Sequence, residues 1–317
     1  MTKVKGTFTR FVGLDVGKKT ILVYDSDGQH SGAVDNTKVK LAALAKQFGT
    51  ETLAVCEATG GYEALLLQAF TQAGLAIHRA DACKVKAFIR SFGTLGKTDE
   101  LDALALARYA QERQAKLPLW APPSNSRKTL QALVLRRDEL VAIRTAERNR
   151  LQAPDNQPVR ASLRSMIHSL QRQINALEKQ INSVIASSAR LRQSRETMMS
   201  VPGIGPITAA HLLALMPELG SLTRRQVAAL AGLAPHPKDS GSIKGYRNVR
   251  GGRVQVKRAL FMAALSASKA HPTLKTSYRT LIQRGKKPIV AITVIMRRLI
   301  VILNAKIRDQ NKINLLS

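Results

Sequence analysis

The chain has 317 residues and a formal net charge of +29, from 50 Lys and Arg against 21 Asp and Glu. Such an excess of positive charge favours a polyanionic partner, above all a nucleic acid. Aromatic residues make up only 4% of the chain, so we expect contacts to phosphates and duplex shape rather than stacking on single-stranded bases. Two isolated cysteines and six scattered histidines exclude a disulfide framework and a zinc site.

The charge is distributed unevenly along the chain. Residues 1–120 carry 16 basic and 12 acidic side chains, whereas residues 121–317 carry 34 and 9. The polyanion is therefore expected to bind mainly the second half. Residues 1–10 are polar and basic with no long apolar run behind them, which predicts a cytoplasmic protein without a signal peptide. Arg297 and Arg298 interrupt the last apolar stretch, which predicts a core helix rather than a membrane span.

The first half predicts an α/β domain. Three strands are expected over residues 10–36, with a turn at Asp25-Ser26-Asp27-Gly28. The next elements are a helix with Val39, Leu41, Leu44 and Phe48 on its apolar face (37–48), a strand (53–58), a helix (62–73), a strand (75–79), a basic and partly helical segment (84–97) and a helix (99–113). The order β-β-β-α-β-α-β-α is that of RNase H-like folds.

Acidic residues lie at the ends of these elements. Asp15 follows an apolar run, Glu57 ends the second apolar strand, and Asp99 and Asp102 share one face of the late helix. An ionised carboxylate in a buried strand is costly unless it is paired or binds a metal. Because sites in open α/β sheets gather at strand ends, we expect these four acids to meet and to hold divalent metal ions.

A structural interpretation of the same acids is also open. Thr98 is expected to cap the late helix, and a first-turn position accounts for Asp99 but not for Asp102. The remaining acids of these segments have no comparable setting, so we expect them to be solvated: Glu63, Asp81 and Glu100.

The second half predicts helices. Pro118, Pro122 and Pro123 mark residues 117–126 as a linker. An Arg-rich helix is expected over 128–151, a break at 152–158 and one long helix over 159–195. That helix carries a heptad seam interrupted only at Ser188, with apolar residues at 163, 167, 170, 174, 177, 181, 184 and 191. An antiparallel hairpin within the chain and a coiled coil between subunits both satisfy this pattern.

Residues 201–210 resemble the turn of a helix-hairpin-helix element. Gly203 and Gly205 permit a tight turn, and the amides that open the next helix can hold a phosphate. A helix over 224–232 then leads into a polar loop over 234–242, followed by helices over about 254–270, about 273–283 and from Pro288 to a frayed tail. All charged residues from Ser240 to Arg258 are basic: Lys244, Arg247, Arg250, Arg253, Lys257 and Arg258.

Six stretches of the chain, taken in order, resemble the DEDD-type insertion-sequence transposases related to the Piv and MooV invertases, a family that includes bridge-RNA-guided serine recombinases. The stretches are Gly13-Leu14-Asp15, Glu57-Ala58-Thr59-Gly60, Lys97-Thr98-Asp99 with Asp102-Ala103, Val201-Pro202-Gly203-Ile204-Gly205, Ala231-Gly232-Leu233-Ala234-Pro235 and Asp239-Ser240-Gly241. The resemblance implies a RuvC-like domain (1–120), a coiled-coil region (121–195) and a carboxy-terminal transposase domain (196–317).

The same resemblance implies a mechanism. Asp15, Glu57, Asp99 and Asp102 would bind a pair of Mg²⁺ ions, and Ser240 would attack a DNA phosphate to give a phosphoserine link. Ser242 is an alternative nucleophile. The family further implies a guide RNA and a tetramer in which the serine of one subunit completes the acidic site of another. Nucleic-acid contacts are expected from Lys18, Lys97, Gly203, Gly205 and the six basic residues after Ser240.

Three other functions remain as alternatives. An RuvC-like endonuclease would hydrolyse DNA with a metal-bound water and needs no serine, and from local sequence alone Ser240 is an ordinary turn residue without an identifiable base nearby. A nucleic-acid-binding protein with a degenerate nuclease domain would bind without cleaving. An actin-like ATPase is suggested by Gly13-Leu14-Asp15-Val16-Gly17, although the chain has no Walker-type loop.

Overall fold

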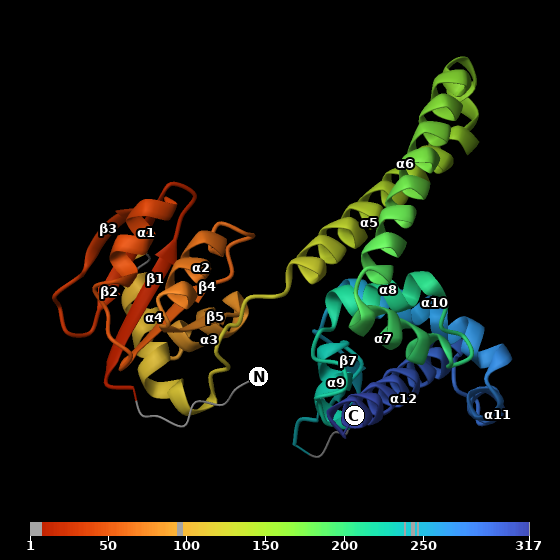
Figure 1. Cartoon of the computed structure of the whole chain (residues 1–317). Coiled ribbons are helices and arrows are strands. Elements are labelled where there is room, and N and C mark those ends of the chain that lie inside the picture. Colours follow the sequence, from red (N-terminus) through yellow and green to blue (C-terminus); the bar gives the residue numbers. More distant parts are fainter. Residues whose placement is uncertain (1–7, 94–97, 238, 242–244, 246, 317) are drawn as a thin grey trace. The chain divides into compact units, whose positions relative to one another are not determined.

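The computed structural model describes residues 8–93, 98–237, 239–241, 245 and 247–316. The chain divides into two compact units, one up to Pro123 and one from Ser124 (Figure 1). The division falls within the predicted Pro-rich linker. The finer boundary at residue 195 stays a prediction.

The first unit is built on a mixed five-stranded sheet. Its strands are β1 (Arg10–Val16), β2 (Thr20–Asp25), β3 (Gly32–Asp35), β4 (Thr52–Glu57) and β5 (Ala76–Ala80), in the spatial order β3-β2-β1-β4-β5. The first three strands pair antiparallel, whereas β4 is parallel to both β1 and β5. The predicted turn between β2 and β3 is confirmed, with the Gly28 amide donating to Asp25 at 2.9 Å. The spatial order and directions of the five strands confirm the predicted RNase H-like sheet.

Helices cover both faces of this sheet (Figure 1). They are α1 (Lys38–Ala45), α2 (Ala64–Gln72), α3 (Ala82–Arg90) and α4 (Asp99–Arg113), with a 3-10 turn η1 (Gln114–Lys116). Leu14 of β1 and Cys56 of β4 pack with α1 and α2 in one core, whereas Phe11 and Val55 pack with α3 and α4 in another. Because side chains alternate along a strand, Gly13 faces the α4 side.

Two details of the first unit differ from expectation. Val39 is 78% exposed, so the predicted apolar face of α1 consists of Leu41 and Leu44 only, with Phe48 buried beyond the helix end. The predicted linker begins as part of the first unit, because the Trp120 amide donates to the Ile77 carbonyl at 2.8 Å and holds this segment along β5.

The second unit is mostly helical. Its helices are α5 (Asn125–Gln152), η2 (Pro154–Val159), α6 (Arg160–Ala186), α7 (Ala189–Met199), α8 (Pro206–Leu215), α9 (Arg224–Leu230), α10 (Val254–Ala270), α11 (Pro272–Gln283) and α12 (Pro288–Leu316). A two-residue ladder joins β6 (Pro235–His236) to β7 (Asn248–Val249). The prediction of a loop over 234–242 therefore missed β6, which is too short to leave a periodic signal. The predicted frayed tail is also wrong, because α12 continues to Leu316.

The heptad seam packs within the chain. Leu170 and Ile174 of α6 form a small core with Leu140 of α5, and the two helices make an antiparallel hairpin. The predicted single helix over 159–195 is wrong, because α6 ends at Ala186 and α7 starts at Ala189. The Ser188 side chain accepts from the Leu191 amide and caps α7, a local bond that competes with continuing the helix.

Helix α12 is long and apolar enough by length and composition to cross a membrane. Its side chains Ile295, Leu299 and Leu303 are fully buried in the core of the second unit. The helix is therefore the core helix of this unit, in agreement with the prediction for residues 289–303.

We expect Gly13→Ala to destabilise the first unit by about 3 kcal/mol or more, because an alanine Cβ would lie 1.8 Å from the Ala103 carbonyl oxygen, which is backbone. Gly49→Ala is the matched control, since its Cβ would meet only the flexible Glu51 carboxylate. Urea denaturation of both variants measures the difference. Equal midpoints for the two variants would contradict the close packing of α4 on β1.

Candidate metal centre and serine arm

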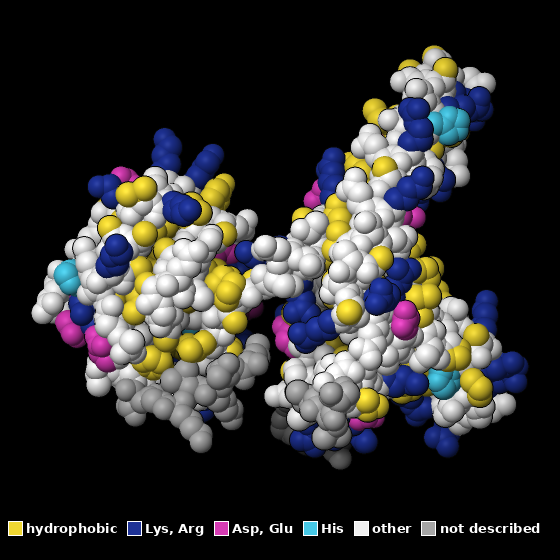
Figure 2. Space-filling view, viewed as in Figure 1, with side chains coloured by type: hydrophobic (Ala, Val, Ile, Leu, Met, Phe, Trp, Pro, Cys, Tyr) yellow, Lys and Arg dark blue, Asp and Glu magenta, His cyan; other side chains and the backbone are white. Residues whose placement is uncertain are grey.

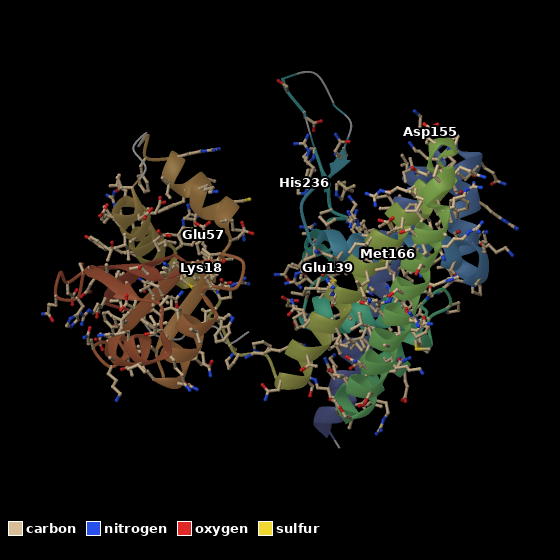
Figure 3. All side chains as sticks on the ribbon, turned by 90° about the horizontal axis from the view of Figure 1, so that it is seen from above. Lys18, Glu57, Glu139, Asp155, Met166 and His236 are labelled. Atoms are coloured by element: carbon tan, nitrogen blue, oxygen red, sulfur yellow. The ribbon has the colours of Figure 1, made fainter. Side chains whose placement is uncertain are left out.

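Asp15 and Glu57 lie side by side on the sheet. The parallel register pairs Leu14 with Cys56, so the next residues on the two strands, Asp15 and Glu57, are neighbours at the same strand ends. Both follow the alternation that faces α4. Figure 3 labels Glu57 on the first unit. The prediction that these strands bring their acids to one edge of the sheet agrees with this register.

Helix α4 brings the second pair of acids to the same place. An ideal Cβ on Gly13 would overlap the Ala103 carbonyl, so α4 contacts the backbone of β1 directly at this glycine. Asp102 precedes Ala103 and is half-buried, whereas Asp99 lies one turn earlier and is exposed. The Thr98 hydroxyl accepts from the Leu101 amide at 3.3 Å, which confirms the predicted cap. The cap that Thr98 provides is therefore compatible with a cluster that contains Asp99 and Asp102.

The four carboxylates influence one another electrostatically. Partial burial is the main cause that raises the pKa of Asp15 from 3.8 to about 6, and the charges of Asp102, Asp99 and Glu57 raise it further. Like charges disfavour the ionised form of a carboxyl group, so the neighbouring acids add to the effect of burial on Asp15. A cation placed among them would offset that repulsion.

The donor set suits a hard divalent cation, because all four candidates offer carboxylate oxygens. Within the described residues, no group of three or more His, Cys, Asp or Glu is arranged so that it could hold one ion. The acids thus approach one another without forming a closed ligand set.

Glu63 was predicted to be solvated, and this prediction is wrong. Its side chain is buried and accepts hydrogen bonds from the Thr59 amide and hydroxyl and from the Gly61 amide at 2.9 Å. Arg79 of β5 donates to its other oxygen at 2.8 Å. Burial alone would raise the pKa of Glu63, but these donors outweigh it and hold the pKa below its usual value. Glu63 therefore fixes the loop that follows Glu57.

The sequence carried one signal for this loop, the adjacent glycines Gly60 and Gly61 after the strand that ends at Glu57. Gly60 and Gly61 both have positive φ, +75° and +118°, and two adjacent glycines after a strand indicate a tight loop whose amides need an acceptor. The other two acids, Asp81 and Glu100, are exposed as predicted. Asp81 in addition caps α3, because its carboxylate accepts from the Lys84 amide at 3.1 Å.

The candidate nucleophile lies on what we call the serine arm, the described part of residues 233–250. His236 pairs with Asn248 in the β6–β7 ladder, and Ser240 is exposed beyond it (Figure 3 labels His236). The Asp239 carboxylate accepts from the Gly245 amide at 3.1 Å. Ser242 and Lys244 lie outside the described residues, as does Lys97.

The base of the serine arm is tightly packed. An ideal Cβ on Gly252 would lie 2.0 Å from the Gly232 amide nitrogen, so only glycines permit this crossing. Arg253, next to Gly252, also holds the base of the arm, because its guanidinium donates two hydrogen bonds to the Glu218 carboxylate, at 2.8 and 2.7 Å. Its charge is thus paired within the fold, and its role as a nucleic-acid contact stays a prediction.

The other predicted nucleic-acid contacts differ in exposure. Lys18, Arg247, Arg250 and Arg258 are exposed, and Lys257 is half-buried. Figure 2 shows Lys and Arg side chains in dark blue along the α5–α6 hairpin and over the body of the second unit. Lys18 lies in the turn that follows β1, three residues after Asp15. Figure 3 labels Lys18 and Glu57 on the first unit. These exposed cations remain candidate phosphate contacts.

The glycines of residues 201–205 have separate structural reasons. Gly203 has φ +99°, and its ideal Cβ would lie 2.6 Å from the Ala267 Cβ, so this position packs against α10. Gly205 precedes α8 as its N-cap, with Pro206 at the first helical position. The tight turn between α7 and α8 agrees with the prediction, whereas phosphate binding there stays a prediction.

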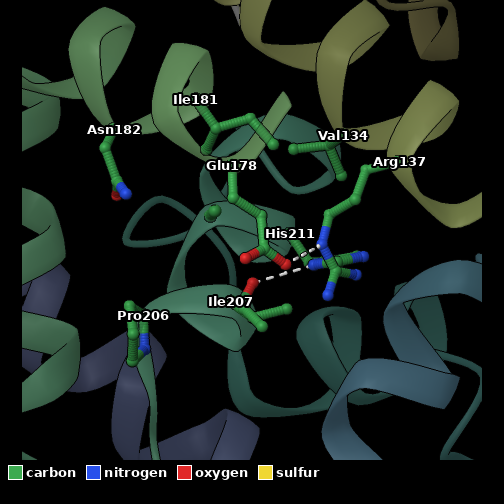
Figure 4. Close-up of a pocket in the computed structure, with 9 residues that line it drawn as sticks. Val134, Arg137, Glu178, Ile181, Asn182, Pro206, Ile207 and His211 are labelled. Carbon is green, nitrogen blue, oxygen red and sulfur yellow. Dashed lines mark hydrogen bonds and ion pairs between the residues drawn. The ribbon is translucent and has the colours of Figure 1, made fainter. Parts of the chain in front are cut away.

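A cavity of about 150 Å³ lies where α5 and α6 meet α8 (Figure 4). Arg137 donates to Glu178 at 2.8 Å, and the buried His211 contacts both the Asp138 carboxylate, at 2.8 Å, and the Ile207 carbonyl, at 2.8 Å. These polar pairs join the hairpin to the start of α8. The cavity contains none of the predicted catalytic residues.

Comparisons with known proteins agree with this geometry. Residues 12–154 match a DEDD transposase family of IS110, and residues 195–279 match the transposase family IS116/IS110/IS902. The chain is 29% identical over 311 residues to the pilin gene-inverting protein of Moraxella lacunata. The aligned region covers 94% of this chain and 96% of that protein. It is 40% identical over 114 residues to the 43.6 kDa protein of insertion element IS110 from Streptomyces coelicolor, which covers 35% of this chain and 28% of that protein.

The fold and these matches define a transposase, a phosphoryl-transfer enzyme that acts on DNA. The chain belongs to the IS110 family of DEDD transposases and is a homologue of the pilin gene-inverting proteins. Membership of this family implies a divalent metal, and the carboxylate donors at the end of β1 fit one. The family assignment favours DNA transposition over the actin-like ATPase alternative.

We expect Glu63→Ala to lower the free energy of unfolding by about 2–3 kcal/mol, because it leaves Arg79 and two amides of the Glu57 loop without their acceptor. Glu100→Ala is the control and should change stability by less than about 0.5 kcal/mol, since Glu100 is exposed. Chemical denaturation provides the measurement. Equal effects of both substitutions would show that Glu63 does not hold the loop.

We expect Asp15→Asn to stabilise the metal-free protein above about pH 6 and to have little effect near pH 4. In the folded state the pKa of Asp15 is raised from 3.8 to about 6. Ionisation of Asp15 therefore has no destabilising effect below pH 3.8, and it lowers the stability of the wild type by the full amount above pH 6. Allowing for partial exposure, the gain is about 1 kcal/mol. Denaturation midpoints of wild type and variant across this pH range, with EDTA present, test it. A variant less stable than wild type at pH 8 would refute the repulsion.

Proposed function

We propose that this transposase is a Mg²⁺-dependent recombinase that cleaves and exchanges DNA strands through a covalent phosphoserine intermediate. The observation that carries the proposal is the convergence of Asp15, Glu57 and the first turn of α4 at one end of the sheet. The mutual effect of these acids on the pKa of Asp15 supports a site that needs a cation. The relatives named for inverting a pilin gene support recombination as the outcome.

In this proposal Asp15, Glu57, Asp99 and Asp102 hold a pair of Mg²⁺ ions. Bound Mg²⁺ would neutralise the scissile phosphate and lower the pKa of the attacking hydroxyl. Asp15 and Glu57 come from strands and Asp102 from the helix pressed onto β1, so the rigid sheet sets their spacing. Glu63 acts through the loop after β4 and positions Glu57.

Ser240 is the proposed nucleophile. Its Oγ forms a bond to phosphorus while the bond from phosphorus to a deoxyribose oxygen breaks, and the proton that Ser240 loses is balanced by the one that the leaving oxygen gains. Exposure of Ser240 on an arm with an anchored base supports this role. Rejoining reverses the same step with a new deoxyribose hydroxyl, which needs no external energy source because the phosphoserine bond conserves the phosphodiester.

Three further features belong to the proposal. A structured guide RNA would select the DNA sites, supported by the 34 basic residues of segment 121–317. A tetramer would let the serine of one subunit meet the acids of another. A helix-hairpin-helix turn at Gly203 and Gly205 would contact a DNA phosphate through backbone amides. The reaction would take place in the cytoplasm.

Trapping on nicked DNA tests the nucleophile. We expect wild type and Ser242→Ala to form a covalent adduct that survives denaturing electrophoresis, and Ser240→Ala to form none, because only Ser240 provides the attacking oxygen. Asp15→Asn should bind DNA with similar affinity and form no adduct. Undiminished cleavage by Ser240→Ala would favour the RuvC-like endonuclease instead. An adduct retained by Asp15→Asn would remove the metal site from the mechanism.

A further inference from the structure

A second, smaller cavity lies in the second unit between α5, α7, α8 and α12. Its volume is about 30 Å³. Two guanidinium groups line it, Arg127 from the first turn of α5 and Arg190 from the first turn of α7, together with the polar side chains of Ser194 and Asn311. The remaining walls are apolar side chains of the helical core.

The half-buried Arg127 has no protein partner for its Nε. Its Nε is buried and has no hydrogen-bond partner, and among the described residues neither Arg127 nor Arg190 takes part in an ion pair. Arg137 of the neighbouring hairpin differs, because it bonds to Glu178. The Nε atoms of Arg144 and Arg160 also have no partner, so Arg127 is distinguished by sharing its cavity with a second guanidinium group, that of Arg190. A buried donor without an acceptor is costly, so the Arg127 Nε needs an acceptor from outside the fold, either a water or a ligand.

The nearest acid does not neutralise this pair. Glu218 feels the charge of Arg127, but both of its oxygens already bond to Arg253. Burial and, next, the charge of Arg190 lower the pKa of Arg127, so the two cations repel each other in a partly desolvated place. Two converging guanidinium groups without a counter-charge match an oxyanion, which accepts several charge-assisted hydrogen bonds.

We propose that Arg127 and Arg190 form a phosphate-binding site that holds one backbone phosphate of DNA. The cavity admits about two groups of the size of water, which matches the two non-bridging oxygens of a phosphodiester and is too small for a base. Ser194 supplies a neutral hydroxyl donor at the same cavity. Arg190 is exposed and Arg127 half-buried, so the ligand approaches from the Arg190 side.

The site rests on the DNA binding of the family and not on the serine mechanism. All measurements therefore use full-length protein carrying Asp15→Asn, which prevents cleavage and keeps the two hypotheses separable. The test variant is Arg127→Gln with Arg190→Gln. The control is Lys128→Gln with Arg192→Gln, which removes equal charge from exposed neighbours on the same two helices.

The first measurement is the melting temperature in inorganic phosphate and in chloride at matched ionic strength. We expect phosphate to raise the melting temperature of the parent and the control, and to have no specific effect on the test variant. In chloride the test variant should melt at or above the parent, because relief of repulsion is stabilising. A lower melting temperature in chloride, or an unchanged response to phosphate, would overturn the site.

The second measurement is DNA affinity as a function of salt. Loss of one phosphate contact should reduce the slope of log affinity against log salt by about 1 in the test variant relative to the control. Equal slopes, even with phosphate binding lost, would reassign the cavity to a free anion and overturn the DNA assignment. An RNA duplex of the same sequence is the third arm, and a loss confined to RNA would likewise overturn it.

Discussion

The direct contact of α4 with β1 is the constraint on which the candidate metal centre depends. Gly13 has no side chain, and any Cβ there would overlap the backbone of Ala103. The helix can therefore lie close enough to the strand that Asp102 and Asp99 act on Asp15 electrostatically. Glu57 joins them because β4 runs parallel to β1 in fixed register. Rigid elements, rather than flexible loops, thus set the spacing of the acids.

The acidic side chains of the protein fall into two electrostatic settings, one of mutual repulsion and one of ion pairing. Asp15 carries an unfavourable charge among other acids, whereas the buried Glu63 and the anchoring Glu218 are satisfied by Arg79 and Arg253. Satisfied charges hold loops in place, and unsatisfied ones mark positions where a counter-ion would bind. The same distinction separates Arg253, which is structural, from Arg127, which has no protein acceptor for its Nε.

The serine arm is anchored only at its base. Gly232 and Gly252 cross at backbone contact, and the adjacent Arg253 is bonded to Glu218 and to the Leu215 carbonyl at 2.5 Å. Beyond β6 and β7, Ser240 is exposed. This arrangement fixes the base of the arm on the helical unit, whereas Ser240 at its tip is exposed to solvent. The seam of α6, in contrast, is used within the chain to build the hairpin.

Apolar periodicity and capping residues are local signals, so the order of the strands, the acids at the strand ends and most helix limits could be predicted before the structure was known. Prediction from the sequence failed for Glu63, which is buried and bonded to Arg79, a partner 16 residues away. Ser188 ended a helix that the heptad pattern predicted to continue. Only tertiary structure brought Gly13 against Ala103 and Arg127 beside Arg190, because close approach and charge convergence depend on packing between distant segments.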